Sequence, residues 1–125
     1  MTGGAALTIW VGVVLAGGVG AVLRFLVDRA VARRAARSFP FGTLAVNISG
    51  AALLGLLGSL ALSRYTALLA GTAFVGSYTT FSTWMLETQR LSEERQVLNA
   101  VANIVVSIVL GIGAALFGQW IAGRL

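Results

Sequence analysis

The fold of this chain is decided by one stretch, Gly76-Ser77-Tyr78-Thr79-Thr80-Phe81-Ser82-Thr83-Trp84, which places five serine and threonine side chains inside an otherwise apolar run. A run this apolar is typical of a membrane-spanning segment, and the hydrocarbon of a bilayer offers no water to satisfy polar groups. Residues that disfavour a helix survive at that depth only where they face protein or a water-filled path. The stretch therefore predicts a membrane helix that is interrupted in its middle, with the functional site at the interruption.

Composition places the rest of the chain in the same class. Of 125 residues, 58% are hydrophobic and 10% are charged, and the mean hydropathy is +0.90. Such values exceed those of an ordinary soluble domain. Apolar runs at about 7–26, 41–62, 65–86 and 97–121 each meet the ~20 residues that a helix needs to cross a bilayer. We expect an all-α membrane protein whose four transmembrane helices form a single domain over residues 1–125.

The arginines are distributed unevenly between the two ends of the predicted bundle. Six lie in or beside the links between the first and second and between the third and fourth spans: Arg29, Arg33, Arg34, Arg37, Arg90 and Arg95. The opposite side holds two, Arg64 and Arg124, and Arg24 lies inside the end of the first span. The positive-inside rule then places both termini outside the cytoplasm. Membrane topology thus explains the net charge of +5 without nucleic acid.

Several kinds of chemistry are excluded by residues that the sequence lacks. There is no cysteine and no histidine, so disulfides, thiolate metal sites and histidine-dependent catalysis are impossible. No nucleophile–base pair or metal constellation is visible, and we predict that the chain is not an enzyme. Residues 1–6 carry no cationic side chain and the first apolar run is too long for a signal peptide, so we expect that run to remain as a helix.

Two of the predicted spans carry polar residues at helical spacing. Thr43 and Asn47 are four residues apart in the second span and share one face. In the last span Asn99, Asn103 and Ser107 step by four and make a polar stripe. Buried amides and hydroxyls in lipid must face the bundle interior or water. They could serve only as hydrogen bonds between helices, or they could line a path for an ion.

The chemistry of that path would be neutral, because the acidic residues fall near predicted helix ends or in loops: Asp28, Glu87, Glu93 and Glu94. Proton-coupled transport usually relays through a buried carboxylate or histidine. Neutral groups instead replace the water around an ion one bond at a time without trapping it. Amide NH2 groups, hydroxyls and the edges of aromatic rings suit an anion, whereas the carbonyls of a broken helix suit a cation.

Three motifs, in order along the chain, resemble the Fluc/CrcB family of bacterial fluoride channels. They are Gly17-Gly18-Val19-Gly20-Ala21-Val22-Leu23-Arg24-Phe25, then Pro40-Phe41-Gly42-Thr43-Leu44-Ala45-Val46-Asn47-Ile48-Ser49-Gly50, and Gly76-Ser77-Tyr78-Thr79-Thr80-Phe81-Ser82-Thr83-Trp84-Met85-Leu86-Glu87. The resemblance implies a channel that exports fluoride across the bacterial inner membrane and lowers cytoplasmic fluoride. It also implies an antiparallel, dual-topology dimer with two narrow pores. A central Na+ at the dimer two-fold is implied to bind the backbone carbonyls of Gly76 and Thr79 from both subunits.

The resemblance further implies a role for each pore residue. Asn47 donates its amide to fluoride, and Phe81 offers its ring edge. The hydroxyl groups of a polar track are implied to belong to Thr43, Ser82, Thr83 and Ser107. Arg24 matches a basic residue near the pore vestibule, where it could attract anions, although an arginine reaching to the membrane interface is an equally good interpretation.

The chain departs from the family pattern at two positions. Trp84 stands where a second phenylalanine is usual, and Ser77 where a second glycine is usual. Trp84 keeps a ring edge for the fluoride path and adds an indole N–H donor, but it is bulkier. Ser77 makes the interruption less permissive of positive φ.

The partner and two other classes of function stay open. A subunit that inserts both ways tends to carry little arginine bias, so six against two is compatible with a homodimer or with a heterodimer containing an oppositely oriented paralogue. Small multidrug-type transporters are also four-helix antiparallel dimers, but they need a membrane-embedded glutamate in the first helix, which this chain lacks. A non-transporting membrane assembly subunit is the third alternative, and an ion flux assay separates it from a channel.

Overall fold

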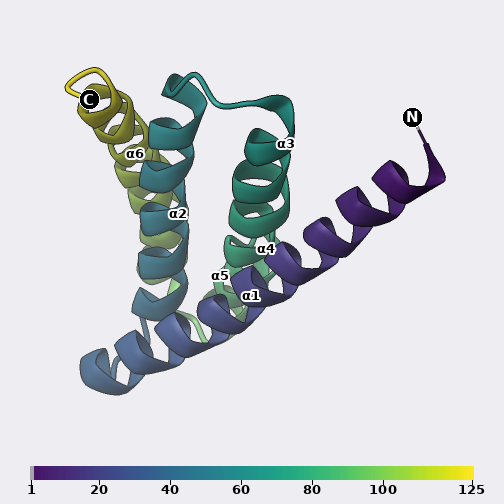
Figure 1. Ribbon diagram of the computed structural model, residues 1–125. Helices are drawn as coiled ribbons and strands as arrows, with labels where there is room; N and C mark the ends of the chain where they lie inside the picture. Colours follow the sequence, from purple (N-terminus) through teal and green to yellow (C-terminus); the bar gives the residue numbers. More distant parts are fainter. Residues whose placement is uncertain (1) are drawn as a thin grey trace.

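The structure, a computed structural model, describes residues 2–125, and over that range it is built of helices with no strand. Three helices are long and apolar enough to cross a membrane: α1 (Gly3–Ala35), α2 (Phe41–Ser59) and α6 (Val97–Ala122). In Figure 1, α2 and α6 stand side by side, and α1 crosses the molecule obliquely. A further helical column lies beside α1 and α2, and it carries the remaining segments.

That column is segmented rather than continuous. It begins with α3 (Arg64–Ala67), continues as the π-helical segment η1 (Leu68–Val75) and ends with α4 (Gly76–Tyr78). After a non-helical connection at residues 79–81, α5 (Ser82–Glu93) follows. The chain leaves the helix at Thr79, whose backbone is extended with φ −82° and ψ 163°. The predicted span at 65–86 is therefore not one uninterrupted helix. The depth of the interruption in a membrane stays a prediction.

The first predicted span, 7–26, is shorter than the helix that contains it. Helix α1 continues to Ala35 because residues 27–35 contain neither glycine nor proline and are rich in alanine and arginine, which favour helix. Arg33 and Arg34 in its last turn also stabilise the negative end of the helix dipole. The chain then turns through Ala36, which has a positive φ of 46°. Helix α2 ends at Ser59, before the predicted limit of 62.

Glycines allow α2 and α6 to approach until their backbones touch. A Cβ atom placed on Gly55 would overlap the carbonyl oxygen of Ala115. One placed on Gly118 would overlap the carbonyl oxygen of Ala52 and the amide nitrogen of Leu56. Small residues serve this purpose in membrane proteins, where no hydrophobic effect drives helices together and close packing takes its place. The pair α2–α6 is therefore a rigid support for the elements on the other side of α2.

Glycines also allow α1 and α2 to pack closely against the segmented column. Gly20 of α1 lies against the backbone carbonyl of Phe74, and Gly50 of α2 lies against the side chain of Thr79. The Gly50 contact falls at Thr79, where the interruption between α4 and α5 begins, and the Gly20 contact lies in η1, before α4. Val46, one turn before Gly50, is fully buried. Helix α2 thus packs on the place where the column is not helical, and α1 packs on the helical part just before it.

Candidate functional site

The centre of the candidate site is a pair of hydrogen bonds between Asn47 of α2 and the backbone of Thr80. The Asn47 amide nitrogen Nδ2 donates to the Thr80 carbonyl over 2.8 Å, and the Thr80 N–H donates to Asn47 Oδ1 over 2.8 Å. Thr80 lies outside any helix, so its own N–H and C=O have no helical partners. The Asn47 side chain takes their place. Its Nδ2 carries a second N–H that makes no hydrogen bond within residues 2–125.

This arrangement diverts two backbone amides from their helical partners. In a continuous helix the Thr80 N–H would reach the Gly76 carbonyl and the Thr83 N–H would reach the Thr79 carbonyl. Here the Thr80 N–H goes to Asn47, and the Thr83 N–H goes to the Thr80 hydroxyl over 3.1 Å. The carbonyls of Gly76 and Thr79 are left without those partners. They are the two groups predicted to bind a cation, and free carbonyl oxygens are suitable ligands for one.

Side chains are a poor alternative for holding a metal. Within residues 2–125 no group of three or more Asp, Glu, His or Cys side chains gathers closely enough to do so. Gly76 and Thr79 instead line one cavity, between α2 and the segmented column, whose other walls are mainly apolar.

A second, small cavity on the other side of Thr80 is polar. Its walls come from α1, α2 and the start of α5: Arg24, Asp28, Thr43, Val46, Thr80 and Thr83. The Nε atom of Arg24 is buried and has no hydrogen-bond partner among the described residues. Thr43 is 2% exposed, and its hydroxyl lies 3.5 Å from the Glu87 carboxylate. One guanidinium, three hydroxyl-bearing side chains and the Asp28 carboxylate thus line the cavity, and the Glu87 carboxylate lies next to Thr43.

The aromatic residue at the start of α5 points elsewhere. Phe81 is 70% exposed and Ser82 is also exposed, and neither lines the polar cavity. The Ser82 hydroxyl lies 3.5 Å from the hydroxyl of Thr80. Thr80 therefore connects the polar cavity with the exposed side on which Phe81 and Ser82 lie. Phe81 pairs with Trp84 in an edge-to-face arrangement, with the ring centroids 5.7 Å apart.

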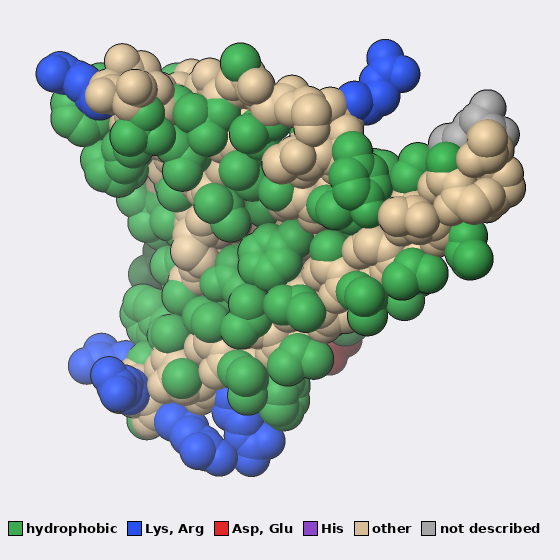
Figure 2. All heavy atoms as spheres, viewed as in Figure 1, with side chains coloured by type: hydrophobic (Ala, Val, Ile, Leu, Met, Phe, Trp, Pro, Cys, Tyr) green, Lys and Arg blue, Asp and Glu red, His purple; other side chains and the backbone are tan. Residues whose placement is uncertain are grey.

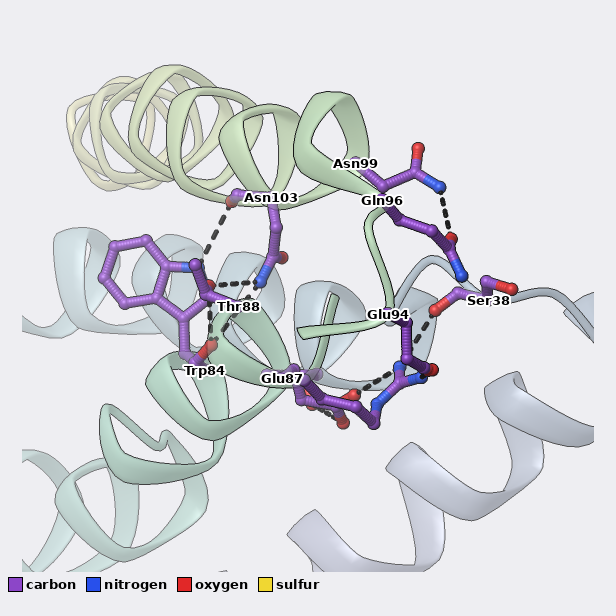
Figure 3. A network of polar contacts seen from close by, with 10 residues as sticks. Ser38, Trp84, Glu87, Thr88, Glu94, Gln96, Asn99 and Asn103 are labelled. Carbon is purple, nitrogen blue, oxygen red and sulfur yellow. Dashed lines mark hydrogen bonds and ion pairs between the residues drawn. The ribbon is translucent and has the colours of Figure 1, made fainter. Parts of the chain in front are cut away.

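Helix α6 joins the site through Trp84, whose indole N–H donates to the Asn103 carbonyl over 3.2 Å (Figure 3). Asn103 is fully buried. Ser107 lies one turn further along α6, and its hydroxyl oxygen is buried without a partner in the described part of the chain. Asn103 and the Ser107 hydroxyl, both of the predicted polar stripe, are therefore buried in the fold, and Asn103 contacts α5.

Near the C-terminal end of α5, Arg90 forms two ion pairs. The Arg90 guanidinium binds Glu87 over 3.1 Å and Glu94 over 3.0 Å, and it donates to the Ser38 carbonyl over 3.0 Å (Figure 3). The hydrogen bond to Glu87 raises the pKa of Arg90, so this side chain stays charged at any working pH. Arg90 thereby ties the link after α1 to α5, beside Glu87, whose carboxylate lies next to Thr43.

The structure brings together four of the residues predicted for the path, Arg24, Thr43, Asn47 and Thr83, around Thr80. It places Phe81, Ser82, Trp84 and Ser107 further along, toward α6 and the exposed face. The sequence prediction did not include Thr80, Asp28, Glu87 or Thr88 among the site residues. Glu87 could have been found, because it follows Thr83 by four residues on the same face of α5.

Comparison with known proteins gives consistent matches along nearly the whole chain. Residues 11–119 match the family described as CrcB-like protein, Camphor Resistance (CrcB). A protein of Mycobacterium bovis named Fluoride-specific ion channel FluC 2 is 72% identical over 124 residues, covering 98% of both chains. A protein of the same name from Mycolicibacterium paratuberculosis is 74% identical and covers 93% of this chain and 95% of its own. Fluoride-specific ion channel FluC 1 of Leifsonia xyli is 44% identical, covering 89% and 84%.

Proposed function

The chain belongs to the CrcB-like family, and from that premise we propose that it is a fluoride-selective ion channel that carries fluoride out of the cell. The observation that carries the proposal is the similarity, over nearly the full length, to relatives named fluoride-specific ion channels. Passive export of this kind lowers cytoplasmic fluoride without a proton relay or a catalytic group.

In this proposal the four helical columns all cross the inner membrane of a bacterial cell, and α3 to α5 make the crossing that is interrupted. Figure 2 supports the orientation: basic side chains gather at the two ends, and hydrophobic side chains cover the surface between them. More arginines lie at the end where α1 finishes and α2 begins. That end faces the cytoplasm, and both termini lie outside it.

We propose that fluoride enters through the polar cavity beside Thr80. The Arg24 guanidinium attracts the anion, and Asp28 and Glu87 offset that charge so that the ion is not trapped. Fluoride is small and strongly hydrated, so it needs several close donors at once. The Thr83 hydroxyl and the second N–H of Asn47 are such donors, and the Thr43 hydroxyl becomes one if it turns away from Glu87; all three are neutral.

Beyond Asn47 the proposed path follows the start of α5 and the inner face of α6. The ring edge of Phe81 is a weakly positive site that carries no full charge. The Ser82 hydroxyl, 3.5 Å from that of Thr80, and the buried Ser107 hydroxyl extend the donor series. The path thereby passes from a charged mouth to a neutral interior.

We also propose a structural Na+ bound by the carbonyls of Gly76 and Thr79, where two subunits meet. The support is that both carbonyls lack their helical amide partners. A bound cation would compensate these oxygens in the membrane, where water is absent. Thr80 and Thr83 contribute to this site because their backbone N–H groups bind Asn47 and the Thr80 hydroxyl instead of the two carbonyls.

The assembly proposed is an antiparallel dimer, either of two copies or of this chain with an oppositely oriented paralogue. The exposed Phe81 ring and the apolar cavity that contains Gly76 and Thr79 are both surfaces that a second subunit would cover. Arginine bias between the two ends favours the paralogue, and a complete set of path residues in one chain favours two copies.

Flux from liposomes tests the function directly. The purified chain is reconstituted into liposomes loaded with potassium fluoride or potassium chloride, and efflux is started with a potassium carrier and followed with ion-selective electrodes. We expect rapid fluoride efflux and retained chloride. Fluoride efflux by this chain alone would exclude the obligate heterodimer, and efflux only with the paralogue would establish it. Chloride efflux as fast as that of fluoride, or no fluoride efflux in either preparation, would refute the channel.

A further inference from the structure

Trp84 is fixed to the neighbouring helix by its own polar atom. Its indole Nε1 donates to the backbone carbonyl of Asn103, 3.2 Å away (Figure 3). An indole has a single N–H and no acceptor, so this bond uses its whole hydrogen-bonding capacity. Trp84 therefore has no free donor to offer to a passing anion.

Two further bonds close the contact into a network. The Asn103 side chain donates from Nδ2 to the Thr88 hydroxyl over 2.9 Å and to the Trp84 carbonyl over 3.4 Å. The Thr88 hydroxyl in turn donates to the Trp84 carbonyl over 2.9 Å. Asn103 is fully buried, so none of its bonds competes with water. The backbone and the ring of Trp84 are thus both tied to one residue of α6.

The other side of the indole ring faces Phe81. The two rings meet edge to face, with centroids 5.7 Å apart and an interplanar angle of 79°. Phe81 immediately precedes α5 and is 70% exposed, so few other contacts restrain its side chain within the subunit. An edge-to-face pair with an anchored partner restricts the orientation of an exposed ring.

We propose that Trp84 is a positioning residue: anchored to α6 through Asn103 and Thr88, it sets the orientation of the Phe81 ring. The inference rests on the proposed function, in which the Phe81 edge contacts fluoride. The Trp84 ring orients Phe81, and the indole N–H anchors that ring to α6. The substitution of tryptophan for the usual phenylalanine then adds a link to α6 rather than a donor to the pore.

Flux measurements on four variants test the ring's role: Trp84→Phe, Trp84→Ala, Phe81→Ala and the double alanine variant. We expect Trp84→Ala to lower fluoride efflux about tenfold, to the level of Phe81→Ala, and the double variant to fall no further. Trp84→Phe keeps a ring but loses the indole anchor, so its efflux should lie between those of the wild type and of Trp84→Ala. Trp120→Ala, which removes a ring stacked on Phe117 of α6, is the matched control and should conduct normally.

Two results would overturn the inference. If Trp84→Phe conducts like the wild type, the indole anchor does not set the orientation of Phe81. If the losses in Trp84→Ala and Phe81→Ala multiply in the double variant, Trp84 acts on the ion independently of Phe81. A wild-type chain that conducts no fluoride, alone or with its paralogue, would instead refute the proposed function. The two failures are therefore distinguishable.

The anchor has a readout that needs no flux. The chain has three tryptophans, and the indole N–H signal of Trp84 in a nitrogen-15 NMR spectrum is the one that Trp84→Phe removes. We expect this N–H to exchange slowly with solvent, and Thr88→Val to shift its signal and speed its exchange at least about tenfold, because the network loses its hydroxyl. Thr66→Val, in the distant α3, should change neither. Unchanged exchange in Thr88→Val would remove Thr88 from the anchor, and exchange of the wild-type Trp84 N–H as fast as that of an exposed indole would refute the anchor itself.

Discussion

Helix α2 makes two contacts of opposite character. Toward α6 it presents Gly55, and the two backbones touch where side chains are missing. Toward the interruption it presents Asn47, Ser49 and Gly50, and polar atoms join the two segments: Asn47 binds the Thr80 backbone, and the Ser49 and Tyr78 hydroxyls lie 2.8 Å apart. The first contact is apolar and between continuous helices. The second replaces hydrogen bonds that the chain gave up when it left the helix.

The contact between α2 and α6 serves mainly the stability of the fold, whereas the contact between α2 and the interruption serves the binding of an ion. Backbone contact between α2 and α6 leaves no atom free to bind an ion, and it cannot be adjusted without moving a helix. At the interruption a few side chains hold carbonyls and hydroxyls in place, and some of their hydrogen-bonding capacity remains for an ion. The rigid contact supports the adaptable one, because both use the same helix.

The largest effect on stability is expected where the apolar contact is broken. A methyl group at Gly118 would overlap backbone atoms of Ala52 and Leu56, so Gly118→Ala forces the helices apart. We expect it to lower the free energy of unfolding by about 1–3 kcal/mol. Gly113→Ala is the matched control on the same helix, since its methyl group meets open space and alanine favours helix by up to about 1 kcal/mol. Thermal unfolding in detergent compares them, and equal midpoints would contradict the backbone contact.

A smaller effect on stability, with a larger one on transport, is expected at the polar contact. A methyl group at Gly50 would meet the Thr79 side chain, which can rotate, whereas Gly118 faces backbone. Gly50→Ala should therefore cost about 1 kcal/mol or less. Because Thr79 adjoins Thr80, fluoride efflux should nevertheless fall about tenfold, equivalent to about 1.4 kcal/mol in the barrier.

Gly58→Ala, on the same helix with open space around it, should change neither quantity. The comparison between the two faces of α2 fails if Gly50→Ala destabilises the protein as much as Gly118→Ala. It fails equally if Gly50→Ala leaves efflux intact.

Much of this organisation can be predicted from the sequence because it is local. Apolar length gives the crossing helices, and the polar run from Ser77 to Thr83 marks the place where helix is disfavoured. Spacing puts Thr43 and Asn47 on one face. The motif resemblance also predicts Arg24, Thr43, Asn47 and Thr83, which the structure gathers around Thr80.

What could not be predicted depends on contacts between distant segments. Gly113 and Gly118 look alike in the sequence, but only Gly118 meets a backbone. The pairing of Asn47 with Thr80 joins residues 33 positions apart, and no periodicity encodes it. Positive φ at the interruption proved unnecessary, because an extended Thr79 makes the turn and no described glycine has positive φ. Trp84 appeared as a departure from a family pattern, and only its bond to Asn103 gives it a distinct role.

The central claim is that Asn47 serves both the interruption and the anion, and Asn47→Asp tests it most directly. The carboxylate keeps an acceptor for the Thr80 N–H, loses the donor to the Thr80 carbonyl and adds a negative charge. We predict that fluoride efflux from liposomes falls at least about a hundredfold while the protein still elutes as a folded species, since a like charge ~4 Å away costs a few kcal/mol at an effective dielectric constant of ~20. Asn99→Asp, the same change on α6 at a residue whose amide donates to Gln96, should conduct normally. Undiminished efflux in Asn47→Asp would contradict the account.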